Sequence, residues 1–309
     1  MGRLGHTVPV PSIVIPAHNE ERSLGRLLDA LLDGARDEEF DIVVVCNGCT
    51  DATARVAAGH GPRVRVVETP VPSKHEALRL GDEHARGFPR IYVDADVVLG
   101  AGDVRALADA LAGPDAVLAA APERELPMTG CSWPVRAYYR VWQRLPAVRE
   151  GLFGRGVIAM SGEGHARIAA LPPLMADDLA ASLAFGPAER RVVGTARVVV
   201  RPPRTWRDLI RRRVRAATST AQLEDHQARS TTAAEGRAPA AEERAPAAAP
   251  PSARTGVSDL RALLRADPTL LPAVVVFLSA ALAARRGARK AIGARDFDTW
   301  LRDESSRQD

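Results

Sequence analysis

Two aspartates separated by one alanine directly follow an apolar segment of the chain. The segment is Arg90–Val93, and the acids are Asp94 and Asp96. Residues two apart on an extended backbone point to the same face, so the two carboxylates would repel each other unless a cation lies between them. Mg²⁺ and Mn²⁺ are typically held by one or two carboxylates together with the phosphates of a substrate. The pair therefore predicts a divalent metal site, and the alternative is a strand end with two solvated acids.

The elements that would position these acids alternate between strand and helix over the first 120 residues. Helical periodicity is clearest at residues 24–32, where five leucines fall on one face. Short apolar runs that predict buried strands occupy residues 10–16, 41–45, 64–68, 90–93 and 116–121. Apolar strands that alternate with helices predict an α/β fold with a Rossmann-like, mostly parallel sheet, helices on both faces and further helices toward the C-terminus.

Polar motifs lie where three of the predicted strands end. Residues 16–20 read PAHNE, residues 46–51 read CNGCTD, and residues 94–96 read DAD. Ligands of parallel sheets bind at the carboxyl ends of the strands, so these motifs predict one shared binding site. The simpler interpretation of Asn47-Gly48 is a tight turn. Cys46 and Cys49 form a C-x-x-C, but no second pair or histidine set completes a zinc site.

The order and spacing of these motifs resemble those of a bacterial inverting glycosyltransferase of family 2, which has the GT-A fold. PAHNE resembles the family's P-x-x-N-E, and VVVCNGCTD resembles its V-D-D-x-S-x-D. SKHEALRLG resembles the helix start that precedes the D-x-D motif, and DAD resembles that motif itself. The resemblance covers most of the chain up to about residue 223. It implies transfer of a sugar from a UDP- or GDP-linked donor to an acceptor that is a lipid, a glycan or a small molecule.

The resemblance also implies which residues bind the metal and the donor. Asp96, together with Asp94, would hold Mg²⁺ or Mn²⁺. The residues implied in nucleotide-sugar binding are Pro16, Ala17, His18, Glu20, Asn47, Lys74, Asp94, Arg212 and Arg215. Two features depart from the family pattern. Asn47 replaces an acid that commonly contacts the base, although an amide can still read a base edge, and the two arginines lie in a degenerate Q-x-x-R-W that lacks Gln and Trp.

A second acidic pair, Asp177 and Asp178, lies at the start of a predicted helix in the second half of the chain. One simple interpretation is that one acid caps the helix and the other interacts with its dipole. The resemblance instead implies that the pair supplies the general base, Asp178 first and Asp177 as the alternative. The aromatic-rich segment 131–145 either belongs to the core or lines a groove for the acceptor.

The chain is predicted to have three parts. Residues 1–223 would form the GT-A domain, with a nucleotide-sugar half up to about residue 120 and an acceptor half from about residue 121. Residues 224–256 are rich in Ala, Pro and charge and poor in large apolar residues, which predicts a disordered linker. Residues 257–309 would form a C-terminal helical segment.

The apolar run 270–284 in this last segment is followed by RRGARK. Its 15 residues fall short of the roughly 20 needed to span a bilayer. The run therefore either packs on the catalytic domain or, within residues 270–290, lies in a membrane interface with its arginines toward anionic lipid.

Composition limits the classes of protein to which the chain can belong. A 46% hydrophobic content supports a globular core, and the net charge of +4 is small. Three cysteines, an odd number, favour a reducing compartment, and no signal peptide is visible; we expect a cytoplasmic protein, either free or at the inner face of the membrane.

Two other classes of function compete with the transferase interpretation. A sugar-phosphate nucleotidyltransferase would need a glycine-rich first loop, which residues 16–23 lack. A non-catalytic basic protein could use the seven arginines of segment 201–215 to bind a membrane or nucleic acid. Because no nucleic-acid-binding motif accompanies those arginines, no nucleic-acid partner is expected.

Overall fold

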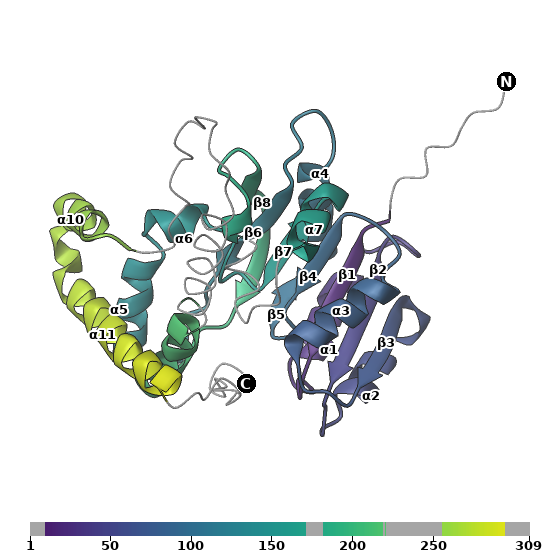
Figure 1. Ribbon diagram of the computed structural model, residues 1–309, viewed down its shortest axis with the longest axis horizontal. Coiled ribbons are helices and arrows are strands. Elements are labelled where there is room, and N and C mark those ends of the chain that lie inside the picture. The colour runs from purple at the N-terminus through teal and green to yellow at the C-terminus, as the bar shows by residue number, and fades with distance from the viewer. Residues whose placement is uncertain (1–9, 171–181, 219, 221–254, 294–309) are drawn as a thin grey trace, which may run out of the picture. The chain divides into compact units, whose positions relative to one another are not determined.

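The computed structural model describes residues 10–170, 182–218, 220 and 255–293, and the chain divides into two compact units (Figure 1). The first unit contains residues 1–127, 154–172 and 187–201, and the second contains residues 128–153, 173–186 and 202–309. Residues 224–254 of the predicted linker lie outside the described residues. The predicted domain boundaries therefore stay a prediction.

An eight-stranded mixed sheet forms the centre of the first unit, in the order β3-β2-β1-β4-β7-β6-β8-β5. Its parallel half consists of β1 (Ser12–Ala17), β2 (Asp41–Asn47), β3 (Val64–Thr69) and β4 (Arg90–Val93). The other half consists of β5 (Val97–Leu99), β6 (Ala119–Glu125), β7 (Val157–Met160) and β8 (Arg190–Val200), where β7 runs antiparallel to β4 and to β6. The predicted α/β sheet is confirmed, and β5 and β7 are strands that the sequence did not predict.

Helices cover both faces of the sheet. On one face, α1 (Leu24–Leu32) and α4 (Ala101–Ala110) bury their leucines in a cluster with Ile13, Ile15 and Val44. On the other face, α3 (Lys74–His84) packs Ala77 against Val43 and Val45. The described part of this unit also contains α2 (Thr53–Ala58), the 3₁₀ turn η1 (Gly61–Arg63) and α7 (Gly162–Ala169). Alternate residues of β2 thus face opposite layers, which is why this strand is apolar from Ile42 to Cys46.

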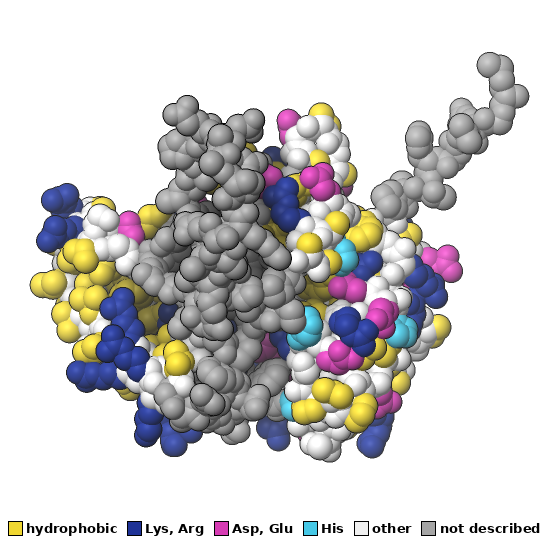
Figure 2. Space-filling model, viewed as in Figure 1, with side chains coloured by type: hydrophobic (Ala, Val, Ile, Leu, Met, Phe, Trp, Pro, Cys, Tyr) yellow, Lys and Arg dark blue, Asp and Glu magenta, His cyan; other side chains and the backbone are white. Residues whose placement is uncertain are grey.

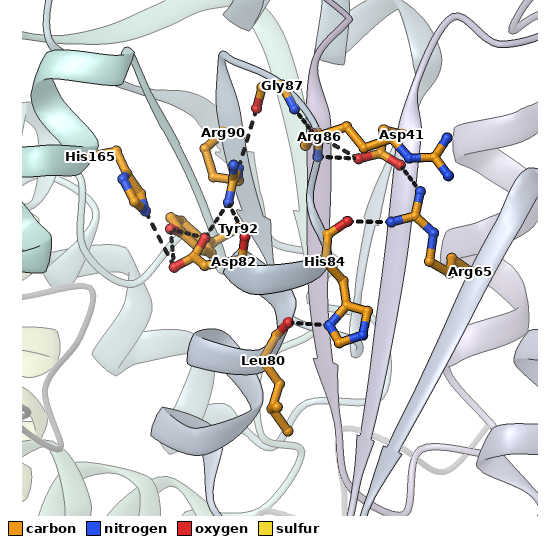
Figure 3. Close-up of polar contacts among 11 residues, drawn as sticks. Asp41, Arg65, Leu80, Asp82, His84, Arg86, Gly87, Arg90, Tyr92 and His165 are labelled. Carbon is orange, nitrogen blue, oxygen red and sulfur yellow. Dashed lines mark hydrogen bonds and ion pairs between the residues drawn. The ribbon is translucent and has the colours of Figure 1, made fainter.

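Charged side chains meet at the amino ends of the parallel strands (Figure 3). Asp41, the first residue of β2, accepts hydrogen bonds from Ser12 Oγ at 2.9 Å and from Arg65 Nη2 at 2.7 Å. Arg90, the first residue of β4, is 4% exposed and donates to Asp82 Oδ1 of α3 at 2.5 Å. These contacts join β2 to β1 and β3, and β4 to α3.

Asp82 is the centre of one part of this network. It accepts the hydroxyl of Tyr92 at 2.8 Å, and Nε2 of His165 on α7 lies 3.3 Å from its other oxygen (Figure 3). Burial by itself would raise the pKa of Asp82, but the hydrogen bonds from His165 and Tyr92 and the charge of Arg90 outweigh it and lower that pKa. Burial and the neighbouring carboxylate raise the pKa of Tyr92. An ionised Asp82 therefore joins α3, β4 and α7.

The second unit is helical in its described parts. It contains α5 (Trp133–Trp142), α6 (Pro146–Glu150), a helix over residues 206–218, α10 (Val257–Ala266), the 3₁₀ turn η2 (Pro268–Leu270) and α11 (Leu271–Gly293). α11 lies along α5 (Figure 1), and Phe277 stacks on Tyr138 with ring centroids 5.2 Å apart.

α11 is longer than the apolar run that predicted it. Its 23 residues extend to Gly293 because the alanines and basic residues after residue 284 continue the helix. The segment Pro268–Lys290 is long and apolar enough to cross a membrane by length and composition, and 33% of its most apolar 18-residue stretch is buried. The packing of Phe277 on α5 shows that one side of this helix contacts the unit that carries it.

Candidate functional site

The loops that follow β1 and β2 are joined by hydrogen bonds. Asn19 adopts a φ of 53°, a left-handed conformation that Asn tolerates, and its Oδ1 accepts the backbone N–H of Thr50 at 2.7 Å. The backbone N–H of Glu20 donates to Thr53 Oγ1 at 2.8 Å. Asn19 does not cap the helix that follows it: α1 begins at Leu24, and Asn19 uses its side chain to hold the neighbouring loop.

Glu20 is buried beside the start of α1. Glu20 is 7% exposed, and its Oε2 accepts a hydrogen bond from the Ser23 hydroxyl at 2.6 Å. This contact holds the carboxylate near the positive end of the helix dipole. The role of Glu20 in donor binding stays a prediction.

Asn47 ends β2 with its side chain buried. It is 2% exposed, and its Nδ2 donates to the carbonyl oxygen of Ala17 at 2.9 Å, which fixes the orientation of the amide. Its Oδ1 is buried and has no hydrogen-bond partner. An unpaired buried acceptor costs about 1–3 kcal/mol, so such an atom in a native structure needs an explanation. The positive φ of 56° belongs to Gly48, which makes the turn, while Asn47 itself remains in the strand.

His18 lies next to the same strand end. Its Nδ1 is 2.5 Å from the carbonyl oxygen of Asn47. A carbonyl oxygen only accepts, so this contact places a proton on Nδ1 and fixes the ring at the end of β2. The imidazole is half-buried, which leaves part of the ring accessible.

The two aspartates lie on a turn between β4 and β5. The turn is closed by a hydrogen bond from Val97 N to Asp94 O at 3.4 Å, and Asp94 N donates to Gly156 O at 2.8 Å. The extended backbone expected for Asp94 and Asp96 is therefore wrong. The chain turns at this point because β5 leaves β4 and pairs with β8.

Lys74 supplies a positive charge beside the first aspartate. Ser73 caps α3 by accepting the N–H of Glu76, so Lys74 is the first residue of the helix. Its Nζ lies 2.9 Å from Asp94 Oδ1, and the two side chains are 36% and 41% exposed. An ion pair this exposed contributes about 0–1 kcal/mol, so both groups can exchange partners when a charged ligand binds.

Gly156 is a residue of this region that sequence reasoning did not single out. It has a φ of 66°, and a Cβ atom there would lie 2.6 Å from Val97 Cγ1 and 3.3 Å from Asp94 Oδ2. Only glycine fits without strain. The proximity of Gly156 to the aspartate turn is a tertiary contact that the sequence alone does not reveal.

The carboxylates of Asp94 and Asp96 fit a metal ion that also takes ligands from a bound substrate. Asp94 and Asp96 offer partly exposed carboxylates on one short turn, which suits Mg²⁺ or Mn²⁺ bound together with phosphates. Among the described residues no group of three or more His, Cys, Asp or Glu could hold a metal ion by itself. Burial, followed by the neighbouring Cys49, raises the pKa of Cys46 to about 12, so this thiol stays protonated near neutral pH and is a poor zinc ligand.

The remaining predicted residues are distributed over both units. Pro16 and Ala17 end β1 beside Asn47. Arg212 and Arg215 lie half-buried in the helix of residues 206–218 in the second unit. Asp177 and Asp178 lie outside the described residues. The roles of these four charged residues stay predictions.

Comparison with known protein sequences matches the first half of the chain to glycosyltransferases. Residues 12–162 match the family model described as glycosyl transferase family 2. An uncharacterized glycosyltransferase of Mycobacterium tuberculosis is 38% identical over 124 residues, which are 40% of this chain and 52% of the relative. A dolichyl-phosphate beta-glucosyltransferase of Drosophila melanogaster is 37% identical over 98 residues, which are 28% of this chain and 30% of the relative. The chain thus matches about half, or less, of the length of these curated relatives.

Comparison with solved structures shows the fold. A mannosyltransferase of Pyrobaculum calidifontis, solved in complex with GDP-Man and Mn²⁺, has a TM-score of 0.55 at 20% sequence identity, and the match covers 97% of this chain and 85% of that one. The arrangement of a mixed sheet with flanking helices is therefore that of the GT-A glycosyltransferases, as the motifs predicted.

Proposed function

We propose that the chain, whose residues 12–162 match the model of glycosyl transferase family 2, belongs to that family and transfers a sugar from a nucleotide-sugar donor with inversion at the anomeric carbon. One observation carries this proposal. The loops that end β1, β2 and β4 place an unpaired amide oxygen, a histidine and two aspartates at adjacent strand ends. A parallel sheet binds nucleotides at this edge. The family match gives no support to a sugar-phosphate nucleotidyltransferase.

We propose that Asn47 reads the base of the donor. Its Nδ2 donates one hydrogen to Ala17 O, and its Oδ1 is a buried acceptor without a partner in the fold. Uracil and guanine both carry a ring N–H that could donate to this atom, which supports a UDP- or GDP-linked donor. The solved mannosyltransferase with GDP-Man supports the same class of ligand. His18 would stack on the base, and the backbone at Pro16 and Ala17 would form the wall of the base site.

We propose that Asp96, with Asp94, holds Mg²⁺ or Mn²⁺. The ion, when bound, neutralises the charge that develops on the diphosphate leaving group. Lys74 is within ion-pair distance of Asp94 and can orient that carboxylate or turn its ammonium to the diphosphate. Arg212 and Arg215 are proposed as further diphosphate ligands.

We propose Asp178 as the general base, with Asp177 as the alternative. The hydroxyl oxygen of the acceptor forms a bond to the anomeric carbon while the bond from that carbon to the diphosphate breaks, and the carboxylate takes the hydroxyl proton. The acceptor is a hydroxyl group on a lipid, a glycan or a small molecule. Three free cysteines, Cys46, Cys49 and Cys131, support a reducing, cytoplasmic setting.

The experiment that tests the proposal is thermal stabilisation by a panel of nucleotide sugars, with Mn²⁺, with Mg²⁺ and with EDTA. A ligand at 100 times its Kd adds about 2.7 kcal/mol, which raises the Tm of a chain of this size by roughly 4 °C. Asp96→Ala should lose the metal-dependent part of the shift. Asp109→Ala, an exposed acid on α4, is the matched control and should keep it. If no nucleotide sugar raises the Tm with either metal, the proposed function is wrong.

A further inference from the structure

The helix α11 has two contrasting sides. Its buried side contacts the rest of the second unit. Phe277 stacks on Tyr138 of α5. A Cβ atom on Gly287 would lie 2.5 Å from Val214 Cγ2, so α11 also lies close to the helix of residues 206–218 there. The other side carries a row of exposed aliphatic residues, Leu271, Val275, Leu278 and Leu282, which are 49–57% exposed. Their spacing of four, three and four residues places them on one stripe, called here the α11 stripe.

Exposed apolar side chains concentrate on this part of the chain. Nine large hydrophobic residues are exposed among the described residues, and six of them belong to α10 and α11. The six are the four residues of the α11 stripe, Val257 and Ile292. α10 has no buried residue at all. Figure 2 shows hydrophobic side chains gathered over α10 and α11. Single exposed hydrophobic residues are normal on soluble proteins, but a contiguous row of them marks a surface that binds another protein or a membrane.

The charges beside the α11 stripe are almost all positive. Arg285, Arg286 and Arg289, called here the basic end, continue the same side of the helix after Leu282 and are exposed. Arg261, Arg265 and Lys290 are exposed nearby on the two helices, and Figure 2 shows Lys and Arg side chains around the hydrophobic ones. The two acids of α10 and η2 serve as caps: Asp259 accepts the N–H of Gly256 at 2.8 Å, and Asp267 accepts that of Thr269 at 3.1 Å.

We propose that α10 and α11 form a docking surface for an anionic phospholipid bilayer. The α11 stripe enters the acyl boundary with the helix parallel to the membrane plane, and the basic end contacts the phosphate headgroups. An interfacial helix is recognised by this combination of an apolar stripe and flanking Arg side chains. Arginine stems can lie along the apolar surface while the guanidinium reaches the headgroups. The inference concerns binding alone and does not depend on the proposed catalytic activity.

Two other occupants fit the surface less well. The α11 stripe offers four half-exposed aliphatic side chains, against the roughly 20–30 residues a side of a stable protein interface, so a second copy of the chain is disfavoured. A membrane-spanning α11 would have to give up the stacking of Phe277 on Tyr138 and the close contact with Val214. A surface-bound helix keeps both contacts.

Vesicle co-sedimentation of the purified full chain tests the proposal. We expect binding to vesicles of phosphatidylcholine with 30% phosphatidylglycerol and little binding to pure phosphatidylcholine. Each basic residue near an anionic surface contributes about fivefold to the partition coefficient, so Arg285→Gln, Arg286→Gln and Arg289→Gln together should reduce binding about 100-fold. Leu278→Ser with Leu282→Ser should reduce binding at least tenfold. Val71→Ser, a 48% exposed hydrophobic of the first unit, is the matched control and should bind as wild type.

The outcomes separate the alternatives. Circular dichroism melts must show that each variant keeps the wild-type Tm, since the substituted side chains are exposed. Bound protein that is released by 0.5 M NaCl or by carbonate at high pH supports surface docking. Resistance to both treatments means that α11 spans the bilayer and overturns the proposal. A dimer in light scattering that the two leucine substitutions abolish, equal binding to neutral vesicles, or no vesicle binding at low salt would each overturn it as well.

Discussion

Replacement of Asn47 by Ala separates its structural role from its proposed role in base recognition. A surface turn residue would contribute little to stability, but Asn47 is 2% exposed and donates to Ala17 O. Loss of this hydrogen bond costs about 1 kcal/mol, and Cys49 Sγ, at 3.4 Å, remains a weak partner for the carbonyl. Removal of the unpaired Oδ1 offsets part of that loss. We therefore expect a decrease of less than about 1.5 kcal/mol in the free energy of unfolding.

The effect on nucleotide binding should be larger. If Oδ1 accepts a ring N–H of the base, Asn47→Ala leaves that N–H unpaired in a buried site. An unpaired buried donor costs about 1–3 kcal/mol, which corresponds to a roughly 5- to 150-fold increase in Kd. Urea unfolding measures the stability, and isothermal titration calorimetry with UDP and with GDP measures the affinity.

Ser12→Ala is the matched control for this experiment. Ser12 is fully buried at the opposite end of β1, where its hydroxyl donates to Asp41 Oδ2 at 2.9 Å. The variant should lose at least as much stability as Asn47→Ala while its nucleotide affinity stays at the wild-type value. A wild-type Kd in Asn47→Ala for the nucleotide that binds would contradict our reasoning and leave Asn47 with a structural role alone.

Two further predictions concern carboxylates. Asp178→Asn should leave donor affinity unchanged and reduce the transfer rate about 10²- to 10⁴-fold, because an amide cannot take the acceptor proton; a wild-type rate in a radiolabelled-sugar transfer assay would move the role to Asp177. Asp82→Asn should lower the free energy of unfolding by about 2–4 kcal/mol at pH 7, because Arg90 loses its buried partner. The pKa of Asp82 is lowered in the folded state, so its contribution to stability is present above about pH 4 and is lost as the pH falls further. Urea unfolding from pH 7 to pH 3 should therefore show the free energies of unfolding of wild type and Asp82→Asn converge. A difference between them that stays constant with pH would refute this.

Much of the fold could be predicted because local sequence and tertiary structure agree. The leucines of α1 have helical spacing and are buried on the face that their spacing defines. The run that begins at residue 41 forms β2, which is buried along its whole length and therefore has apolar side chains on both faces, and the run that begins at residue 64 forms β3, an edge strand that is only partly buried. The polar motifs follow strands that pair in parallel, so their carboxyl ends lie at the same edge of the sheet, as the sequence predicted.

The features that were missed depend on contacts between distant segments. Asn47-Gly48 has the composition of a tight turn, but the hydrogen bond to Ala17, 30 residues earlier, keeps Asn47 in β2. Asn19 caps no helix because Thr50 offers its N–H across the loop. β7 and β5 are only 4 and 3 residues long, and each is defined by its pairing partner rather than by its own sequence.

The two ends of the parallel strands differ in how completely their polar groups are paired. At the amino ends, Asp41 and Asp82 each accept several hydrogen bonds, and the residues that donate them come from different helices and strands. At the carboxyl ends, Oδ1 of Asn47 has no partner, and Asp94 shares an exposed ion pair with Lys74. The paired network stabilises the sheet without any ligand, so the opposite edge can keep an unpaired acceptor and exchangeable charges. The unpaired Oδ1 of Asn47 and the exposed ion pair of Asp94 with Lys74 are the groups at this edge that a ligand could engage.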